Sequence, residues 1–226
     1  GMPILWHIMK NYSHHGINDF IICCGYRGYL IKEYFANYFL HMSDVTFDIK
    51  NNEMKVHKKF AEPWKVTLVD TGLDTMTGGR LKKIQSHLED ETFCFTYGDG
   101  ISNVDISQSL QLHKDTHTIA TVTAVQPPGR FGRMNLTDKI VNSFEEKPIG
   151  DGGWINGGYF ILEPSVFDYL KDDSTIWERG PLEELAKNKQ LSAYKHTGFW
   201  HPIDTLWDKN YLDNLWKENQ APWKVW

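Results

Sequence analysis

An acidic residue framed by glycines follows an apolar stretch near the middle of the chain. Residues 93–97 read Phe-Cys-Phe-Thr-Tyr, which is typical of a buried β-strand, and Asp99 follows between Gly98 and Gly100. In open α/β sheets, ligands bind beyond the carboxyl ends of the strands, and glycine lets other groups approach the backbone closely. Asp99 is therefore a candidate Mg²⁺ ligand beside a phosphate. A tight turn that closes the strand would use the same residue types, so this segment alone leaves both interpretations open.

Two further charged residues stand where they could act on the same ligand. Lys147 precedes a proline, which keeps its backbone extended, and its ammonium group is a compact charge suited to phosphate. A surface turn is the competing interpretation for this Glu-Lys-Pro run. Asp204 precedes the helix expected from Leu206 and could simply cap it. However, two acids at separate strand ends, Asp99 and Asp204, make a divalent-metal pair that single caps do not explain.

Four glycine-bearing segments could present backbone N–H groups to a ligand. Each by itself is more typical of a plain turn, but all four occurring with Lys147 and Asp204 is much less expected by chance. The segments are Thr77-Gly78-Gly79-Arg80, Gly98-Asp99-Gly100, Pro128-Gly129-Arg130-Phe131-Gly132 and Asn156-Gly157-Gly158.

Apolar spacing predicts alternating helices and strands in the first half of the chain, which indicates an α/β fold. The expected helices cover residues 4–12, with a stop at Gly16, residues 30–38, a stretch through Leu81, Ile84 and Leu88, and a stretch from an Asp105 or Ser107 cap to His113. The expected strands lie near residues 20–24, 45–49, 55–57, 65–69, 92–97 and 119–125.

The second half is richer in expected strands. These lie near residues 134–136, 140–144, 154–162, 191–194 and 199–203, with helices near 164–170, 181–188 and 206–216. No linker, repeat or low-complexity stretch interrupts the chain. We therefore expect one domain over residues 1–226, with an α/β part at 1–125 and a β-rich part with a terminal helix at 126–226.

The amino-acid composition limits which binding partners and which cellular compartment are expected. The net charge of −5 and the pI near 6.1, without a Lys/Arg cluster, argue against a nucleic-acid surface. The three cysteines suit neither a disulfide framework nor a zinc site, because Cys23 and Cys24 are adjacent in an expected strand and point to opposite faces. No signal peptide and no apolar stretch of about 20 residues is present. We expect a cytoplasmic protein with reduced thiols and no membrane contact.

The absence of several well-known motifs from the sequence argues against several classes of enzyme. The sequence contains no P-loop, no Gly-x-Gly-x-x-Gly fingerprint, no His-Glu-x-x-His and no Gly-x-Ser-x-Gly elbow. The ten histidines do not cluster at metal-ligand spacing, and the nine tryptophans are more typical of core and subunit interfaces than of base stacking.

The ordered motifs together resemble the sugar-phosphate nucleotidyltransferases, over essentially the whole chain. They are Gly25-Tyr26, Thr77-Gly-Gly-Arg80, Tyr97-Gly-Asp-Gly100, Arg130-Phe-Gly132, Glu146-Lys-Pro148, Asn156-Gly-Gly158 and Asp204-Thr205. Longer stretches are similar to the glucose-1-phosphate cytidylyltransferases within that family. These stretches are residues 3–10, 39–46, 64–72 and 198–205.

The resemblance implies a Rossmann-like mixed sheet and a set of roles. Asp99 and Asp204 would hold Mg²⁺, and Lys147 would contact the sugar phosphate. The other substrate-binding residues would be Glu146 and Asn156 at the glucose hydroxyls, Gly79 and Arg80 in the nucleotide-facing loop, and Gly132 and Gly157. The reaction would join CTP and glucose 1-phosphate to give CDP-glucose and pyrophosphate, in a route to surface polysaccharides. A homo-oligomer is also expected.

One departure from the family pattern limits this expectation. The family begins with a strand, a glycine-rich loop, an arginine and a Lys-Pro segment that grip the triphosphate, and this sequence starts after them. We expect this chain by itself to bind CTP poorly and to catalyse little. Two alternatives stay open: the same reaction with dTTP or UTP, and a non-catalytic remnant that binds sugar phosphate. A metal-dependent glycosyltransferase is disfavoured, because no Asp-x-Asp follows a strand.

Overall fold

The computed structural model describes residues 2–127, 133–145 and 153–226. The chain forms two compact units. The first unit contains residues 1–17, 90–166 and 182–226, and the second contains residues 18–89 and 167–181. The predicted organisation as one domain, divided near residue 125, stays a prediction.

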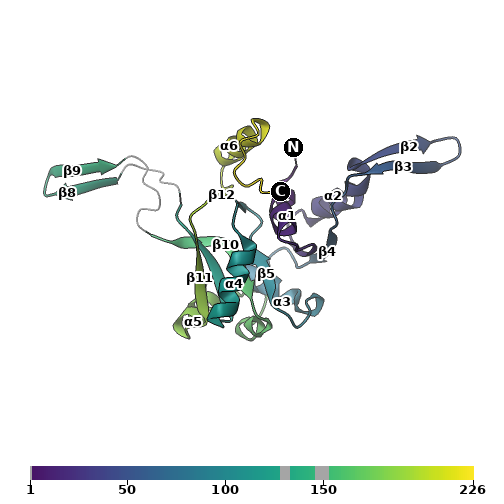
Figure 1. The fold of residues 1–226 in the computed structure, drawn as a ribbon. Coiled ribbons are helices and arrows are strands. Elements are labelled where there is room, and N and C mark those ends of the chain that lie inside the picture. Colours follow the sequence, from purple (N-terminus) through teal and green to yellow (C-terminus); the bar gives the residue numbers. More distant parts are fainter. Residues whose placement is uncertain (1, 128–132, 146–152) are drawn as a thin grey trace. The chain divides into compact units, whose positions relative to one another are not determined.

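A four-stranded mixed sheet forms the centre of the first unit (Figure 1). Its order is β11 (Leu191–His196), β7 (Ala120–Val125), β10 (Ile155–Leu162) and β5 (Phe93–Thr96). β7 and β11 run parallel, and β10 runs antiparallel to both β7 and β5. Almost every side chain of β7 is buried, which explains its continuous β-branched and alanine run instead of an alternating pattern. Helix α4 (Ile106–Thr116) packs on this sheet, and Asp105 caps it.

A two-stranded sheet in the first unit begins directly after Asp99. Strand β6 (Gly100–Ser102) pairs antiparallel with β12 (Trp200–Pro202), and helix α1 (Ile4–His14) contacts β6. Buried Ile101, Leu212 and Trp223 form an apolar cluster behind this pair, together with partly buried Ile203. The unit also contains α6 (Leu206–Lys217) and a hairpin of β8 (Arg133–Thr137) and β9 (Ile140–Glu145).

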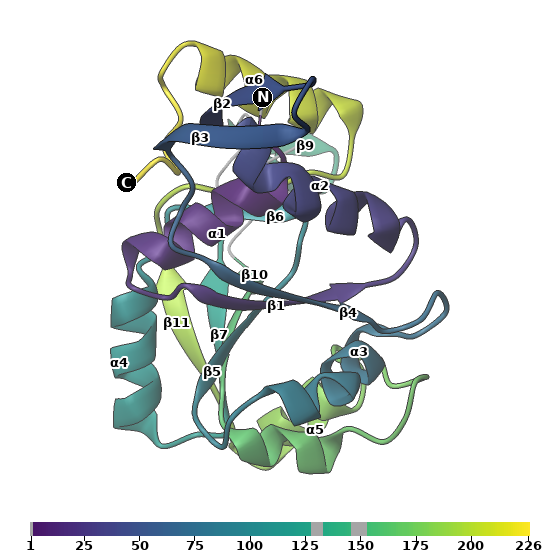
Figure 2. The same ribbon diagram turned by 90° about the vertical axis from the view of Figure 1, so that its right-hand side faces the viewer.

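Parallel strands β1 (Asp19–Cys24) and β4 (Lys65–Asp70) lie side by side in the second unit (Figure 2). Helix α2 (Gly28–His41) contacts β1, and β2 (Ser43–Asp48) pairs with β3 (Glu53–Lys59) in a hairpin. Helix α3 (Thr77–Lys83) is followed by the 3₁₀ turn η1 (Gln85–His87). The remaining elements are the 3₁₀ segment η3 (Pro164–Tyr169) and α5 (Pro181–Lys187), which lie at the boundaries of the units.

The expected strands and helices are confirmed, with three differences. The helix expected through Leu88 ends at Lys83, and the segment expected as a helix at 164–170 is a 3₁₀ helix. Strand β6 was not predicted. Cys24 is buried, Cys23 and Cys94 are half-buried, and all three are free thiols. In the part of the chain that the structure describes, no helix is both long and apolar enough to cross a bilayer.

A buried histidine in α1 makes stability depend on pH. His7 is 8% exposed, packs edge-on against Trp6, Trp216 and Trp223, and accepts a hydrogen bond from the Trp223 indole N–H at 3.4 Å. Burial lowers the pKa of His7 to about 4, against the opposing charge of Asp213. The unfolded chain therefore binds one more proton than the folded chain between pH 6.5 and about 4, so stability falls as pH falls through that window.

We predict that His7→Asn removes this pH dependence, because an asparagine oxygen can accept the Trp223 N–H but does not titrate. The wild-type chain should lose about 3 kcal/mol relative to the variant between pH 7 and pH 4, from a pKa difference of roughly 2.5 units. Urea unfolding followed by tryptophan fluorescence at pH 7, 6, 5 and 4 measures this difference. Parallel curves for the two proteins would contradict the prediction.

Candidate active site

Asp99 lies in the short link between β5 and β6. The pairing of β5 with β10 continues through Tyr97, whose N–H donates to the Gly158 carbonyl at 2.9 Å, and β6 begins at Gly100. Gly98 and Asp99, between the two strands, are exposed. Within the described residues, the Asp99 carboxylate accepts no hydrogen bond, so it is not used to close the turn.

Asp204 lies next to Asp99 because β12 pairs with β6. In the register of this pair Pro202 faces Gly100, and the Ile203 N–H donates to the Asp99 carbonyl at 2.7 Å. Asp204 is the next residue and is exposed. The structure therefore brings together the backbone segments that carry the two predicted metal ligands, which are more than 100 residues apart in the sequence.

The alternative role for Asp204, as a helix cap, is wrong. Thr205 is the N-cap of α6, and its hydroxyl oxygen accepts the Asp208 N–H at 3.2 Å. In return the Asp208 carboxylate accepts the Thr205 N–H at 2.8 Å, which completes a capping box. The capping box of α6 is thus formed by Thr205 and Asp208, and the N-cap position belongs to Thr205 instead of Asp204.

A glycine bulge in β10 brings a polar side chain to the same place. The register between β10 and β7 shifts after Asn156, so that the chain bulges at Gly157 and Gly158. A Cβ at Gly157 would lie 2.9 Å from the Thr123 carbonyl oxygen, and Gly158 has a φ of +78°. Both positions therefore require glycine. The Asn156 amide oxygen accepts the Gly158 N–H at 2.8 Å, which fixes this side chain at the bulge.

A small hollow of about 40 Å³ joins the bulge to the acidic link. Its lining includes three of the predicted site residues, and the others come from β6, β10, β12 and the residue after β5. The lining residues are Tyr97, Asp99, Gly100, Asn156, Gly157, Gly158, Tyr159, Trp200 and Pro202. The Trp200 indole N–H donates to the Gly157 carbonyl at 2.8 Å, and so ties β12 to the bulge.

Tyr159 connects the central sheet to β6 from below the hollow. It is 2% exposed, and its hydroxyl donates to the Gly100 carbonyl at 3.0 Å. Burial raises the pKa of Tyr159, and the charge of Asp99 raises it further. The phenol is therefore neutral at physiological pH and remains a donor that holds the residue after Asp99.

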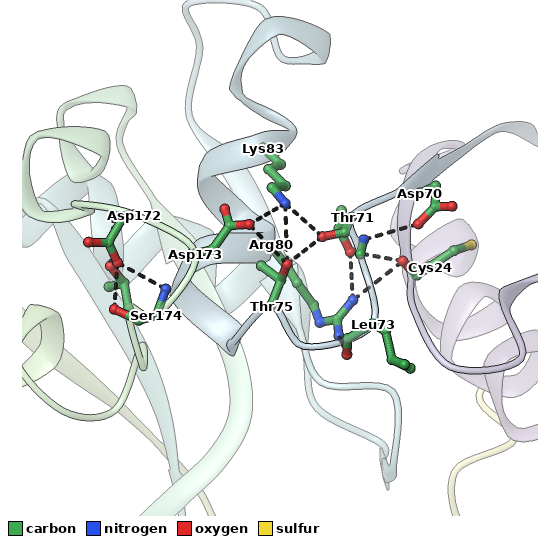
Figure 3. A network of polar contacts seen from close by, with 12 residues as sticks. Cys24, Asp70, Thr71, Leu73, Thr75, Arg80, Lys83, Asp172, Asp173 and Ser174 are labelled. Atoms are coloured by element: carbon green, nitrogen blue, oxygen red, sulfur yellow. Dashed lines mark hydrogen bonds and ion pairs between the residues drawn. The ribbon is translucent and has the colours of Figure 1, made fainter.

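The other predicted substrate residues with described positions lie in the second unit. A Cβ at Gly79 would lie 2.7 Å from the Asp173 Cα, so this glycine allows close packing of α3 against residues 167–181. Figure 3 shows Arg80 directed at the loop after β4. Its guanidinium donates to the Thr71 hydroxyl at 2.7 Å, to the Leu73 carbonyl at 3.2 Å and to the Cys24 carbonyl at 3.3 Å.

Lys83 extends the same network from the next turn of α3. Its ammonium donates to the Asp173 carboxylate at 2.6 Å and to the Thr71 carbonyl at 3.0 Å (Figure 3). Thr71 is fully buried and lies just beyond β4. Two cations of α3 therefore fix the loops beyond the carboxyl ends of β1 and β4, which is where parallel strands place ligands.

Comparison with known proteins now decides the family. The family model described as "Nucleotidyl transferase" matches residues 1–208. The chain belongs to the nucleotidyl transferase family. A glucose-1-phosphate cytidylyltransferase of Salmonella typhimurium is 59% identical to this nucleotidyltransferase over 227 aligned residues, which cover 100% of this chain and 88% of the relative. A probable glucose-1-phosphate cytidylyltransferase of Bacillus subtilis is 42% identical and covers 100% of this chain and 89% of the relative.

Solved structures confirm the expected mixed α/β fold of this nucleotidyltransferase. HddC from Yersinia pseudotuberculosis matches with a TM-score of 0.64 at 22% identity, over 93% of this chain and 84% of that chain. An apo UDP-glucose pyrophosphorylase matches with a TM-score of 0.64 at 16% identity, over 97% of this chain and 90% of that chain. The resemblance drawn from the motifs is also confirmed, because the cytidylyltransferases are among the relatives.

The site residues divide into three sets. Asp99, Asp204, Asn156 and Gly157 lie together in the first unit. Gly79 and Arg80 lie in the second unit. Gly132, Glu146 and Lys147 lie outside the described residues. The roles of all nine stay predictions. Sequence reasoning missed Trp200 and Tyr159, because nothing in the sequence tells which carbonyl an indole or phenol will reach once strands have paired.

We predict that Gly157→Ala destabilises this nucleotidyltransferase by about 1–3 kcal/mol, because the new Cβ would press on backbone at Thr123 and on Val125. Gly98→Ala is the matched control, since its Cβ would meet nothing within 4 Å. Urea unfolding of both variants measures the difference. Equal stability of the two variants would show that the bulge does not need its glycine.

Proposed function

We propose that this nucleotidyltransferase transfers a cytidylyl group from CTP to glucose 1-phosphate and releases CDP-glucose and pyrophosphate. The observation that carries the proposal is the exposed Asp99 at the hollow that Asn156 and Gly157 line, with exposed Asp204 directly after Ile203, whose N–H donates to the Asp99 carbonyl. Similarity to cytidylyltransferases over the full length of this chain supports the choice of nucleotide and sugar.

The donor set at this place fits Mg²⁺. Among the residues that the structure describes, no three His, Cys, Asp or Glu groups gather to form a complete metal cage. Mg²⁺ does not need one, since it usually binds through one or two carboxylates and completes its shell with water and substrate phosphates. Asp99 and Asp204 would hold the ion, which would neutralise charge on the reacting phosphates.

The side chains and backbone of the protein would bind and orient the two substrates, and none of them would react covalently. Attack of a sugar-phosphate oxygen on the α-phosphorus needs in-line alignment and charge neutralisation, but no protein nucleophile. We assign Lys147 to the phosphate of the sugar and Glu146 and Asn156 to its hydroxyls. Gly157 would offer its backbone beside them.

The remaining predicted residues would act on the nucleotide. In this proposal Gly79 and Arg80 shape the loops that face it, and Gly132 contributes from its own glycine segment. Arg80 would act through those loops, because its guanidinium already donates to three oxygen atoms of the chain. A homo-oligomer remains part of the proposal.

We predict that incubation of the chain with CTP, glucose 1-phosphate and Mg²⁺ yields CDP-glucose and an equal amount of pyrophosphate. Asp99→Asn should lower the rate at least about 100-fold, because one of two metal carboxylates is lost. Chromatography of the sugar nucleotide, together with a coupled pyrophosphate assay, measures both products. Asp90→Asn, an exposed acid elsewhere in the first unit, is the control variant and should keep the wild-type rate.

The outcomes separate the alternatives. Faster reaction with dTTP or UTP than with CTP would overturn the nucleotide assignment and keep the reaction class. No CDP-glucose above the Asp99→Asn background would contradict the reaction for this chain, and retained binding of glucose 1-phosphate would then favour the non-catalytic alternative. The expected weak activity stays a prediction, which the same assay measures against the Salmonella typhimurium relative.

A further inference from the structure

Two buried polar side chains flank exposed Asp204 and are hydrogen-bonded to each other. His201 is 8% exposed and Asp208 is 5% exposed, and they stand on either side of Asp204 in the sequence. His201 lies in β12, opposite Ile101 of β6, and Asp208 lies in the first turn of α6. Polar groups buried to this extent are costly unless they are hydrogen-bonded, and here each is a partner of the other.

The Asp208 carboxylate forms hydrogen bonds with both His201 and Thr205. One oxygen of Asp208 lies 3.0 Å from the His201 Nε2, and the other accepts the Thr205 N–H at 2.8 Å and the Thr205 hydroxyl at 2.7 Å. Hydrogen bonds from Thr205, followed by those from His201, hold the pKa of Asp208 below its usual value. The carboxylate is therefore ionised at neutral pH and can only accept, so Nε2 of His201 is the donor.

The consequence is a short backbone segment fixed at three points. His201 is tied to Asp208 on one side of Asp204, and Thr205 is tied to the same carboxylate on the other. Between them, the Ile203 N–H donates to the Asp99 carbonyl. Asp204 is thus exposed to a ligand while the backbone on both sides of it is anchored. A helix cap alone would not require the bond to His201.

We infer that Asp208 and His201 are positioning residues that set the Asp204 carboxylate for the divalent cation. The inference rests on the proposed function, because it assumes that Asp204 is a metal ligand. In other metal sites, residues that orient the ligands without touching the ion have such a role, and their loss weakens binding about 10–100-fold.

The experiment compares Mn²⁺ binding, followed by the loss of the free-ion electron paramagnetic resonance signal, across four variants. Asp208→Asn and His201→Phe remove the connection, and we expect both to weaken Mn²⁺ binding about tenfold. His201→Gln keeps a donor amide, so its affinity should stay within about twofold of wild type. Asp213→Asn is the matched control, since it removes a surface ion pair with Lys209 from the same helix and should leave the affinity unchanged.

A second measurement separates positioning from simple stabilisation. If Asp208 and His201 only stabilise α6, their variants will melt at lower temperature but bind Mn²⁺ as Asp213→Asn does, and the inference is overturned. His201→Phe keeps an aromatic ring beside Tyr211, so it tests the idea even if Asp208→Asn does not fold. Recovery of affinity in His201→Gln supports positioning, because a general loss of stability would not be rescued by a donor.

If the proposed function is wrong, the Mn²⁺ affinities of the wild type and the variants differ in another way. If the wild-type chain binds Mn²⁺ no better than Asp99→Asn, there is no metal site at Asp99 and Asp204, and the inference falls together with the proposed function. If wild type binds Mn²⁺ and makes CDP-glucose while all four variants bind equally well, only the inference is contradicted.

Discussion

The hydrogen bond from the Ile203 N–H to the Asp99 carbonyl is the constraint on which the acidic site depends. It continues a pairing of only three residues on each strand, β6 and β12, so few backbone bonds hold the two acids together. Closing a loop of about 100 residues has an entropic cost that so few bonds would not offset. The apolar cluster of Ile101, Leu212 and Trp223, with Ile203 packed against it, supplies the missing stabilisation. Packing of this apolar cluster therefore keeps the segments that carry Asp99 and Asp204 together.

A second constraint connects the bulge in β10 to the acidic link between β5 and β6 and to β12. The bulge in β10 takes the Gly157 carbonyl out of regular pairing with β7, and this carbonyl accepts a hydrogen bond from the Trp200 indole N–H. Tyr159, which follows the bulge, holds the Gly100 carbonyl from the opposite direction. An unpaired carbonyl in a bulge would be costly if buried, so each donor both satisfies a carbonyl and fixes a distance. The same hydrogen bonds therefore satisfy the carbonyls of Gly157 and Gly100 and hold the strands of the site at fixed distances.

The sequence allowed most elements to be predicted, because local periodicity is enough for long segments such as α1, β1 and α6. Sequence-based prediction was insufficient where an element or a contact depends on residues far away in the sequence. Gly100-Ile101-Ser102 is too short to be seen as a strand, and it is one only because Trp200 to Pro202 lie beside it. The position of Asp204 before Leu206 left a helix cap open as the alternative to the predicted metal ligand, but Thr205 is the cap, since Asp208 three residues later completes a capping box. Trp200 was predicted within a strand, but its hydrogen bond to Gly157 depends on tertiary pairing.

The choice of Thr205 over Asp204 as the cap has an electrostatic consequence. The N-terminus of a helix carries a partial positive charge, which would disfavour a cation close by. Asp208 lies in the first turn of α6, where its negative charge offsets that partial charge. Thr205 and Asp208 form the capping box, so the exposed acid beside the helix N-terminus is not the residue that caps it. If Asp204 holds a metal ion, as we propose, the negative charge of Asp208 lowers the repulsion that the helix N-terminus would exert on that cation.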